Sequence, residues 1–415
     1  MSRQQTLSPT LGSRGAAVVA REAAVAAPNY APLPVVLTRA SGVWAEDVDG
    51  RRYLDMMSGY SAVSLGHGHP RILAALSEQA ARLALTSRAY HTDRLAPWLE
   101  TLTTLAGFDL ALPMNTGAEA VETAIKAARR WGYRTKRIAQ DRARIVVAQG
   151  SFHGRTTTIV GFSSEPAYRD GFGPFAPGFD AVPFGDAKAL RAAIGPDTAA
   201  VMIEPMQGEA GIVIPPDGYL AAVRRACDEA GVLLVLDEVQ TGLGRTGRLF
   251  AFQHEGVRPD VLILGKALGG GVLPVSAVLA DRAVLGLMEP GSHGSTFGGN
   301  PLAAAVSKAA LDVIVEERLP ERAAELGAVL IERLSALRGP GVRDVRGRGL
   351  FVGVELDPAV LSAHEAAEAL LRAGILTKET HETVLRFAPP LVISRAELDE
   401  GVDRILATLR ALLPA

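Results

Sequence analysis

The chain has 415 residues, more than a single hydrophobic core usually spans, so we expect two structural domains. Apolar residues make up 48% and charged residues 21%, a balance typical of globular proteins and unlike that of disordered chains. The 43 basic side chains are balanced by 45 acidic ones, which argues against a nucleic-acid partner and favours a small molecule.

The start of the chain resembles a transit peptide in composition, because residues 1–28 are rich in Ala, Ser and Arg. It holds no apolar signal core, and Glu22 interrupts the pattern, so we predict a frayed start followed by a short helix. The richest apolar run, Val272 to Ala280, is far shorter than the roughly 20 residues that a membrane span needs. We therefore expect no membrane partner.

Short apolar runs alternate with helix-like segments between about residues 110 and 280, which predicts a parallel sheet of strand-helix-strand units. The runs are continuous rather than alternating, as expected for strands that helices cover on both faces. The predicted strands are Ile145 to Ala148, Ala200 to Ile203, Val232 to Leu236 and Val261 to Leu264. The residues that follow them are Gln149 to Phe152, Glu204-Pro205, Asp237-Glu238 and Gly265-Lys266. Ligands of such sheets gather at these carboxyl ends.

After about residue 300 long amphipathic helices predominate, which predicts a smaller α+β domain. The predicted helices are Leu302 to Glu316, Glu321 to Leu337, Glu365 to Ala373 and Arg395 to Leu413. The predicted strands are Leu350 to Glu355 and Val384 to Phe387.

A helix is predicted to begin in the segment Met114 to Glu119, where Thr116 and Glu119 have capping-box spacing. Gly117 allows close approach of the backbone, and the free N–H groups of a helix start suit a phosphate. On the motif alone, a plain capped helix is the simpler interpretation.

Two further patterns follow strands. Gly242 to Gly247 match G-x-G-x-x-G, the pattern of nicotinamide-binding folds. No helix is predicted to begin there, and the next strand ends on Lys266 rather than an acid, so we discount such a fold.

Asp237 and Lys266 end neighbouring predicted strands and precede the glycine run at 269–271. An acid, a lysine and a phosphate cradle together are what pyridoxal phosphate requires.

Cys227 is the only cysteine, which excludes an intramolecular disulfide and a cysteine-based metal cluster. The lack of a second cysteine favours a reducing compartment, so we expect a cytoplasmic location.

His67 and His69 precede Pro70 without a further His or Cys cluster, so a turn explains them better than a metal site.

Several long motifs resemble those of the class III aminotransferases of fold type I, which are dependent on pyridoxal phosphate. They read IEPMQGEAG, LLVLDEVQTGLGRTG, LILGKALGGG and HGSTFGGNP, in the same order. Within that class the chain resembles the ornithine δ-aminotransferases through NYAPLP, SGYSAVSLGHGHP, TSRAYH, SFHGRT, YRDGFGPFAPGF and RFAPPLVI. The resemblance implies an N-terminal segment (1–60) that packs with the small domain and a partner subunit, a large cofactor-binding domain (61–310) and a C-terminal small domain (311–415).

The resemblance also implies which residues bind the cofactor. Lys266 would bond to it covalently and then move the proton, and Asp237 would keep its ring nitrogen protonated. The other implied contacts are Gln240 to the phenolic oxygen, Phe152 to the ring, and Thr116, Gly117 and Ala118 to the phosphate. Thr296 is implied as a phosphate ligand from the second subunit of a homodimer with sites at its interface.

For the substrates, the resemblance implies that Tyr30 and Arg155 bind the α-carboxylate of ornithine. Arg386 would bind that of 2-oxoglutarate, and Glu209 would neutralise Arg386 in the ornithine half-reaction, with Tyr60 beside this pair. The implied reaction converts ornithine and 2-oxoglutarate into glutamate 5-semialdehyde and glutamate.

Two alternatives stay open. A related enzyme acting on acetylornithine, lysine or 4-aminobutyrate is the closer one, and Tyr30 and Tyr60 favour ornithine over it. A non-catalytic cofactor-binding regulatory module is the other, and the intact Lys266, Asp237 and Arg386 argue against it.

The chain departs from the pattern of the ornithine δ-aminotransferases at His153, where a Trp is the more familiar residue. This difference affects the shape of the loop that carries Phe152, the residue implied to stack on the cofactor ring.

Overall fold

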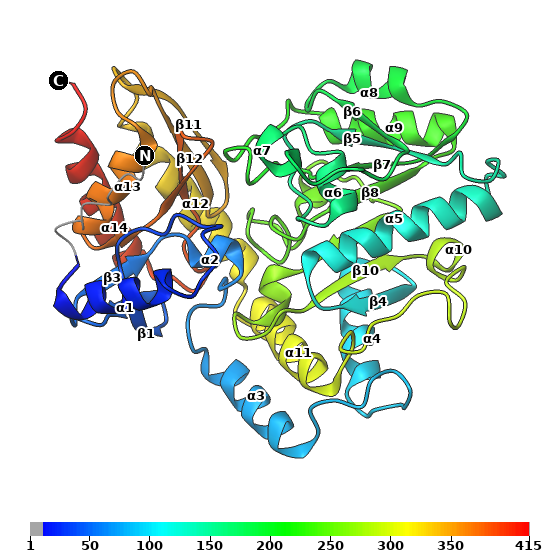
Figure 1. Ribbon diagram of the computed structural model, residues 1–415, viewed down its shortest axis with the longest axis horizontal. Coiled ribbons are helices and arrows are strands. Elements are labelled where there is room, and N and C mark those ends of the chain that lie inside the picture. Colours follow the sequence, from blue (N-terminus) through cyan, green and yellow to red (C-terminus); the bar gives the residue numbers. More distant parts are fainter. Residues whose placement is uncertain (1–10, 415) are drawn as a thin grey trace.

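The computed structural model describes residues 11–414, which form a larger and a smaller lobe side by side (Figure 1). The smaller lobe holds both the first described residues and the C-terminal helix. The expected short helix is α1 (Ser13–Ala23), whereas most of the expected frayed start lies outside the described residues. Within residues 11–414, no helix has the length and hydropathy that crossing a membrane requires.

The larger lobe is built on a seven-stranded sheet with the order β4-β10-β9-β8-β7-β5-β6. Only β10 runs antiparallel to its neighbours, so the sheet is mainly parallel, as predicted. The strands are β4 (Leu110–Met114), β5 (Arg144–Ala148), β6 (Phe179–Val182), β7 (Thr198–Ile203), β8 (Leu233–Asp237), β9 (Val261–Leu264) and β10 (Ser276–Ala280). The four predicted strands are confirmed, with small shifts of their ends.

Helices cover both faces of this sheet, which explains why its strands lack polar alternation. In β8, Leu233 and Val235 belong to the cluster that packs under α5 (Gly117–Arg134). Leu234 and Leu236 belong to the cluster on the opposite face, together with residues of α9 (Tyr219–Ala230).

The smaller lobe contains a four-stranded sheet with the order β11-β12-β15-β14. These strands are β11 (Val342–Arg348), β12 (Phe351–Leu356), β14 (Lys378–Thr380) and β15 (Val384–Phe387), and the helices are α12 (Leu319–Ser335), α13 (Ala363–Arg372) and α14 (Arg395–Arg410). The predicted α+β character, three of the four predicted helices and both predicted strands are confirmed for this lobe, again with shifted ends. The fourth predicted helix, Leu302 to Glu316, also forms, as α11 (Pro301–Glu316), but it packs mainly against α3 (Pro70–Arg82) and α4 (Leu95–Ala106) of the larger lobe.

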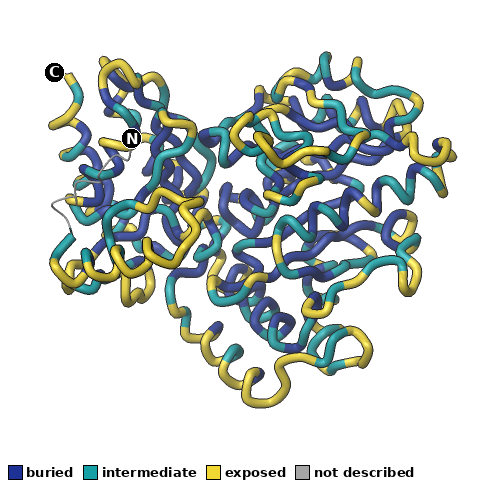
Figure 2. Tube along the Cα trace, in the orientation of Figure 1, coloured by how far each residue is buried: buried dark blue, intermediate teal, exposed yellow. Residues whose placement is uncertain are grey.

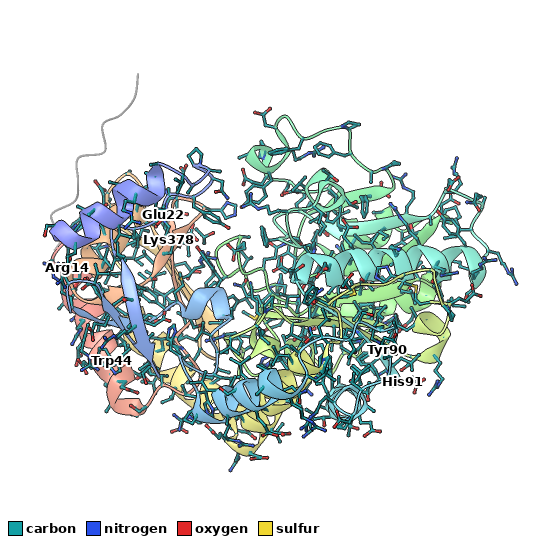
Figure 3. All side chains as sticks on the ribbon, turned by 60° about the horizontal axis from the view of Figure 1, so that its bottom comes forward. Arg14, Glu22, Trp44, Tyr90, His91 and Lys378 are labelled. Atoms are coloured by element: carbon teal, nitrogen blue, oxygen red, sulfur yellow. The ribbon has the colours of Figure 1, made fainter. Side chains whose placement is uncertain are left out.

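An N-terminal sheet also belongs to this lobe, and the apolar pattern did not predict it. Its order is β1 (Leu37–Ser41), β2 (Trp44–Asp47), β3 (Arg52–Asp55) and β13 (Ile375–Leu376), so residues from the two ends of the chain pair with each other. Its edge strand β1 is exposed along its whole length, which explains the missing signal. Figure 3 shows α1, with Arg14 and Glu22 near its two ends, on the same lobe as Trp44.

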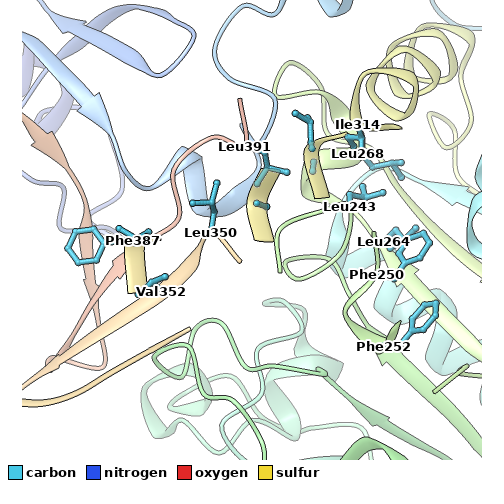
Figure 4. Packing of buried hydrophobic residues seen from close by; sticks show 14 of the residues in the cluster. Leu243, Phe250, Phe252, Leu264, Leu268, Ile314, Leu350, Val352, Phe387 and Leu391 are labelled. Atoms are coloured by element: carbon cyan, nitrogen blue, oxygen red, sulfur yellow. The ribbon is translucent and has the colours of Figure 1, made fainter. Parts of the chain in front are cut away.

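The two lobes share one hydrophobic core. In Figure 4, Leu391 lies between Leu350 and Phe387 on one side and Leu243 and Leu268 on the other. By contrast, α3 is largely exposed and projects from the body (Figure 2). The remaining helices are α2 (Ser58–Ser61), α3 (Pro70–Arg82), α4 (Leu95–Ala106), α6 (Thr157–Gly161), α7 (Pro166–Arg169), α8 (Ala187–Ala193), α10 (Arg282–Leu285) and α11 (Pro301–Glu316), with short 3₁₀ turns at Ala251–His254 and Lys266–Gly269.

Candidate active site

The candidate site lies at the carboxyl edge of the seven-stranded sheet. Thr116 follows β4, Phe152 follows β5, Glu204 follows β7, Asp237 ends β8, and Lys266 follows β9. Because these strands are parallel, their carboxyl ends meet at one edge, which is where ligands bind in open α/β sheets. The sheet therefore brings together the strand-end residues that the sequence singled out.

The start of α5 has the predicted capping box. The Thr116 side chain accepts the Glu119 N–H, and the Glu119 carboxylate accepts the Thr116 N–H at 2.7 Å. Ser276 anchors this turn to β10 by donating its hydroxyl to the Thr116 carbonyl at 2.7 Å. The N–H groups of Gly117 and Ala118, in the first turn of the helix, have no intrahelical acceptor, so they are available to an anion.

Lys266 occupies an unusual backbone position. Its φ is +43°, in the left-handed region that a side chain rarely adopts, and the preceding Gly265 is in an extended conformation. Such strain is concentrated at functional sites. Burial lowers the pKa of the Lys266 ammonium, although the charges of Glu209, Glu204 and Asp237 oppose that effect. The neutral amine, which is the form that attacks a carbonyl, is thereby favoured.

Asp237 is held by two donors. Its Oδ1 accepts the Val239 N–H at 3.0 Å, and its Oδ2 lies 2.7 Å from His153 Nδ1. Burial lowers the pKa of His153, but the hydrogen bond and charge of Asp237, with the charge of Glu204, outweigh burial and raise it. Sequence reasoning noticed His153 only as a departure from the family pattern and missed this contact, although its place next to Phe152 was a signal.

Glu204 supports the loop that carries Phe152 and His153. Its carboxylate accepts the Phe152 N–H at 2.8 Å and the Gly208 N–H at 3.3 Å. Burial raises its pKa to about 7, with a smaller contribution from the charge of Asp237, while His153 and the two N–H donors oppose the shift. Glu204 therefore fixes the loop after β5 to the loop after β7.

A second cluster lies where the two lobes meet. Arg386 on β15 forms an ion pair with Glu209, with 2.8 Å between Nη1 and Oε2, and its guanidinium lies 4.7 Å from the centre of the Tyr60 ring. Arg386 is buried, yet its Nε and Nη1 have no well-aligned hydrogen bond within residues 11–414. Gln240 donates its amide to Glu209 Oε1 at 3.4 Å and to the Tyr60 carbonyl at 3.3 Å. The guanidinium is therefore able to receive a carboxylate.

The loop after β5 presents an aromatic and cationic surface. The Arg155 guanidinium lies 3.5 Å from the centre of the Tyr168 ring and 5.5 Å from that of Phe152. Burial raises the pKa of Tyr168, the charge of Glu209 adds to that shift, and the charges of Arg155 and Arg386 oppose it. Tyr168 is a residue that sequence reasoning did not single out.

Five of the predicted site residues are exposed, namely Tyr30, Tyr60, Thr116, Arg155 and Thr296. Tyr30 is 81% exposed. Thr296 is exposed on the loop before α11, directly after Ser295, which accepts a hydrogen bond from the Asn115 amide at 3.0 Å. Neither Tyr30 nor Thr296 makes a side-chain hydrogen bond within residues 11–414, so both are free to contact a ligand or another subunit.

The glycine motif that was discounted as nucleotide-binding has a structural role. No helix begins inside it, and its Arg245 is fully buried. Arg245 donates hydrogen bonds to the carbonyls of Leu350 and Pro389 and to the hydroxyls of Ser58 and Ser64. It thus joins the larger lobe to both ends of the chain. In the described part of the chain, no group of His, Cys, Asp or Glu side chains is arranged to hold a metal ion.

The residues at the sheet edge fit pyridoxal phosphate, the cofactor that the resemblance implies. A Cβ on Gly117 or Gly265 would lie 3.1 or 3.2 Å from a methyl group of Val239, so a larger residue at either position would crowd Val239 between the helix start and the strand ends. The first-turn N–H groups suit the phosphate, Lys266 suits the aldehyde, and the Asp237 carboxylate suits a protonated ring nitrogen.

Comparisons with known proteins agree with this arrangement. The family model for class-III aminotransferases matches residues 25–409. The ornithine aminotransferase of Geobacillus sp. (strain WCH70) is 58% identical over 377 residues, covering 91% of this chain and 94% of that protein. An ornithine aminotransferase structure from Toxoplasma gondii superimposes with a TM-score of 0.95 at 42% identity, covering 96% of this chain and 94% of that one. An acetylornithine aminotransferase structure from Elizabethkingia anophelis superimposes with a TM-score of 0.86 at 43% identity, covering 96% and 99%.

Proposed function

This chain belongs to the class-III aminotransferases, which depend on pyridoxal phosphate, and we propose that within this family it is an ornithine δ-aminotransferase. It transfers the δ-amino group of L-ornithine to 2-oxoglutarate in a ping-pong reaction. The products are L-glutamate and glutamate 5-semialdehyde, which cyclises to pyrroline-5-carboxylate. The observation that carries the proposal is the ion pair of half-buried Glu209 with buried Arg386, which lies beside Tyr60.

The cofactor supplies an aldehyde that accepts amino groups and a ring that withdraws electrons from the reacting carbon. Gly117 and Ala118 hold its phosphate by their N–H groups, with Thr116 beside them. Phe152 would stack on the ring, and Gln240 would donate its amide to the phenolic oxygen. Asp237 holds a proton at the ring nitrogen, because a buried carboxylate beside that nitrogen favours the charged form.

Lys266 would bond to the cofactor in the resting enzyme and would then move the proton between the reacting carbon of the substrate and the aldehyde carbon of the cofactor. Both roles need an amine that is unprotonated part of the time, and burial supports this by lowering the pKa of Lys266. The nearby carboxylates of Glu204, Glu209 and Asp237 stabilise its protonated form, so the amine is able to alternate between the two states.

Two substrates with different charge patterns share the site. In the first half-reaction, Arg155 and Tyr30 bind the α-carboxylate of ornithine, so that its distal amine reaches the cofactor. In the second, the α-carboxylate of 2-oxoglutarate lies next to the reacting carbon and binds to Arg386. Glu209 pairs with Arg386 during the first half-reaction and releases it for the second. Arg386 supports this exchange, because its Nε and Nη1 make no well-aligned hydrogen bond within residues 11–414 and can therefore donate to a substrate carboxylate.

A substrate panel tests the proposal. Purified enzyme with pyridoxal phosphate and 2-oxoglutarate is given ornithine, acetylornithine, lysine or 4-aminobutyrate, and the cyclised product is trapped. Ornithine is expected to have the highest kcat/KM. A preference for acetylornithine, the substrate named for the Elizabethkingia anophelis structure, would assign the chain to that activity instead. Absence of turnover with every amine would favour the non-catalytic module.

The enzyme is a homodimer with sites at its interface. Exposed apolar side chains on and after α3, together with exposed Phe297 beside Thr296, support an interface on the larger lobe. Thr296 completes the phosphate site of the other subunit. In a mixed dimer, one chain carries Thr296→Ala and the other Lys266→Ala, so both lesions fall in one site and the second site is intact. Activity should therefore return on mixing, and its failure to return would assign Thr296 to its own chain's site.

A cytoplasmic location completes the proposal. Its support is that the single cysteine, Cys227, is buried, where burial raises its pKa to about 12 and leaves it unreactive. Fractionation of cells that express the tagged chain would test the location.

A further inference from the structure

We propose that His293 is a positioning residue for the phosphate of the cofactor, because it fixes to α5 the loop that presents Thr296 to the other subunit. This loop, residues 286–300, connects α10 to α11. His293 is the first residue of the HGSTFGGNP motif, and the sequence assigned it no role. The proposal rests on the role proposed above for Thr296 and not on ornithine as the substrate, so the two can fail separately.

The first argument is the attachment of this loop to α5. Glu119, Thr123 and Lys126 are spaced four and three residues apart, so their side chains share one face of the helix. The His293 ring lies against this face, with Nε2 2.8 Å from Thr123 Oγ1 and Nδ1 2.8 Å from Lys126 Nζ. Both ring nitrogens are therefore engaged by the helix, and one side chain connects the loop to it at two points.

The second argument is that these contacts agree on one form of the ring. The Thr123 hydroxyl donates its proton to the Glu119 carbonyl at 2.7 Å, so towards His293 it acts as the acceptor. The Lys126 ammonium can only donate, so His293 Nδ1 is its acceptor. Both partners thus require the neutral ring with its proton on Nε2. Burial, followed by the charge of Lys126, lowers the pKa of His293, which favours this neutral form.

The third argument is what the attached loop presents. Ser295 accepts a hydrogen bond from the Asn115 amide and another from the Gly298 N–H, both at 3.0 Å. The turn that contains Thr296 is thus closed on itself and attached to the residue before the α5 cap, while Thr296 stays exposed. His293 and Ser295 together hold this turn against their own chain and leave the threonine at the surface, as contact with a second subunit requires.

The experiment separates the phosphate from the rest of the cofactor. His293→Leu removes both ring nitrogens, whereas His293→Gln retains a donor and an acceptor. Equilibrium dialysis gives the dissociation constants of pyridoxal phosphate and of pyridoxal, which has the same ring and aldehyde but no phosphate. Thr296→Ala is measured beside them. His254→Leu is the matched control, because His254 is also half-buried and its Nε2 lies 3.1 Å from the Thr246 hydroxyl.

His293→Leu and Thr296→Ala should each bind pyridoxal phosphate about tenfold or more weakly, the loss expected for one hydrogen bond to a charged group. Both should bind pyridoxal as the wild type does, and His293→Gln and the control should keep both constants. A phosphate-specific loss in Thr296→Ala but not in His293→Leu would overturn the proposal and leave the role of Thr296 intact. Wild-type affinity in both variants would overturn the proposal and that role together. Equal losses for the two ligands in His293→Leu, or equal losses in both His293 variants, would also overturn the proposal.

Mixed dimers show which site His293 serves. A His293→Leu chain and a Lys266→Ala chain carry different affinity tags, and the dimer with both tags is purified. Its only site with Lys266 then receives the Thr296 loop from the chain with an intact His293. The concentration of pyridoxal phosphate that half-saturates activity should match that of the wild type. A value as high as that of the His293→Leu homodimer would overturn the proposal, because His293 would then serve the site of its own chain.

A double variant covers the case in which His293→Leu does not fold. Thr123→Val combined with Lys126→Met removes both partners of the ring, keeps side chains of similar size and leaves His293 in place. The same phosphate-specific loss of affinity is expected. Wild-type dissociation constants for pyridoxal phosphate in this double variant would overturn the proposal.

Discussion

The carboxyl edge of the large sheet and the junction between the lobes contribute different parts of one site. At the sheet edge, Thr116, Asp237 and Lys266 follow parallel strands, so the sheet itself brings them together. At the junction, Tyr60 and Arg386 are far apart in sequence and meet only because the two ends of the chain form one lobe. The reactive groups are thus placed by regular structure, and the groups that select substrates are placed by tertiary contacts.

The two regions also differ in how their side chains are held. Asp237 has a backbone donor and a buried histidine, so its orientation is fixed. Arg386 keeps N–H groups without aligned partners, and Tyr60 lies in a turn with φ of +58°. A site that must accept two substrates in turn needs groups that can change partners, whereas the cofactor needs groups that do not. The predictions below test this division.

The largest expected effect is at the sheet edge. Lys266→Ala should abolish turnover, because the covalent bond to the cofactor and the proton transfer both depend on this amine. The cofactor should still bind through its phosphate. Borohydride reduction followed by peptide mapping should attach the cofactor to Lys266 in the wild type and to no residue in the variant. Lys188→Ala, at an exposed lysine, is the control, and ornithine-dependent glutamate formation well above background in Lys266→Ala would contradict the assignment.

The next effect concerns the junction. Glu209→Ala should expose Arg386 to any α-carboxylate, so the half-reaction with glutamate should speed up relative to that with ornithine. A charge-assisted hydrogen bond of about 1.5–3 kcal/mol corresponds to a shift of roughly tenfold to a hundredfold in the ratio of the two rates. Single-turnover absorbance changes of the cofactor measure each half-reaction separately.

Glu209→Gln, which keeps the size and removes the charge, should shift the ratio in the same direction. Glu332→Gln, at an exposed carboxylate, should leave it unchanged. If the ratio stays constant in both Glu209 variants, the pairing with Arg386 does not control substrate choice.

The sequence predicted the sheet edge better than the junction, and the reason is physical. Continuous apolar runs mark strands buried on both faces, and their ends gave Asp237 and Lys266 without any comparison. The capping box at Thr116 was also readable, because its spacing is local. The N-terminal strands were missed, because β1 is fully exposed and carries no apolar signal and because β2 and β3 are only four residues each.

The junction is not readable from local patterns. Tyr60, Glu209 and Arg386 were named only through the resemblance, because no spacing in the sequence shows that they meet. The contact of His153 with Asp237 joins residues 84 positions apart, and the stacking of Tyr168 on Arg155 depends on how the loop after α6 folds back. Such pairs follow from tertiary packing, which one sequence does not display.

A smaller effect is expected at Tyr168. Its ring packs on the guanidinium of Arg155, so a substitution there tests the proposed ornithine-binding arginine separately from Arg386. Tyr168→Leu removes the ring from the Arg155 guanidinium, a cation–π contact of about 0.5–2 kcal/mol, so KM for ornithine should rise by about twofold to thirtyfold. Tyr168→Phe should keep the wild-type KM. KM for 2-oxoglutarate should change little, since Arg386 binds that substrate.

Phe172→Leu, at an exposed ring on the same loop, is the matched control for loop disturbance. Equal increases of both KM values in Tyr168→Leu would show a general disturbance of the site rather than a loss of Arg155 alignment.

The smallest effect concerns Glu238, which adjoins Asp237 at the sheet edge and serves only the structure. Its carboxylate accepts the N–H groups of Ala251 and Phe252 at 2.6 and 2.8 Å. Burial raises its pKa to about 7 from the ordinary 4.5, the two N–H donors oppose that shift, and the charge of Asp237 adds to it. Its contribution to the free energy of unfolding is therefore full below about pH 4.5 and is lost as pH rises through about 7.

Glu238→Gln keeps a neutral side chain at every pH and loses one acceptor, so it should be less stable than the wild type by about 1–3 kcal/mol at about pH 5. Towards about pH 8 the deficit should shrink or reverse, because the wild type alone pays for an ionised buried carboxyl, on the order of 3 kcal/mol. Thermal unfolding of both proteins across this range measures the difference, with Glu332→Gln as the exposed control. A deficit that stays constant with pH would mean that Glu238 is ionised throughout, and the buried charge would then have to be compensated by its two backbone donors alone.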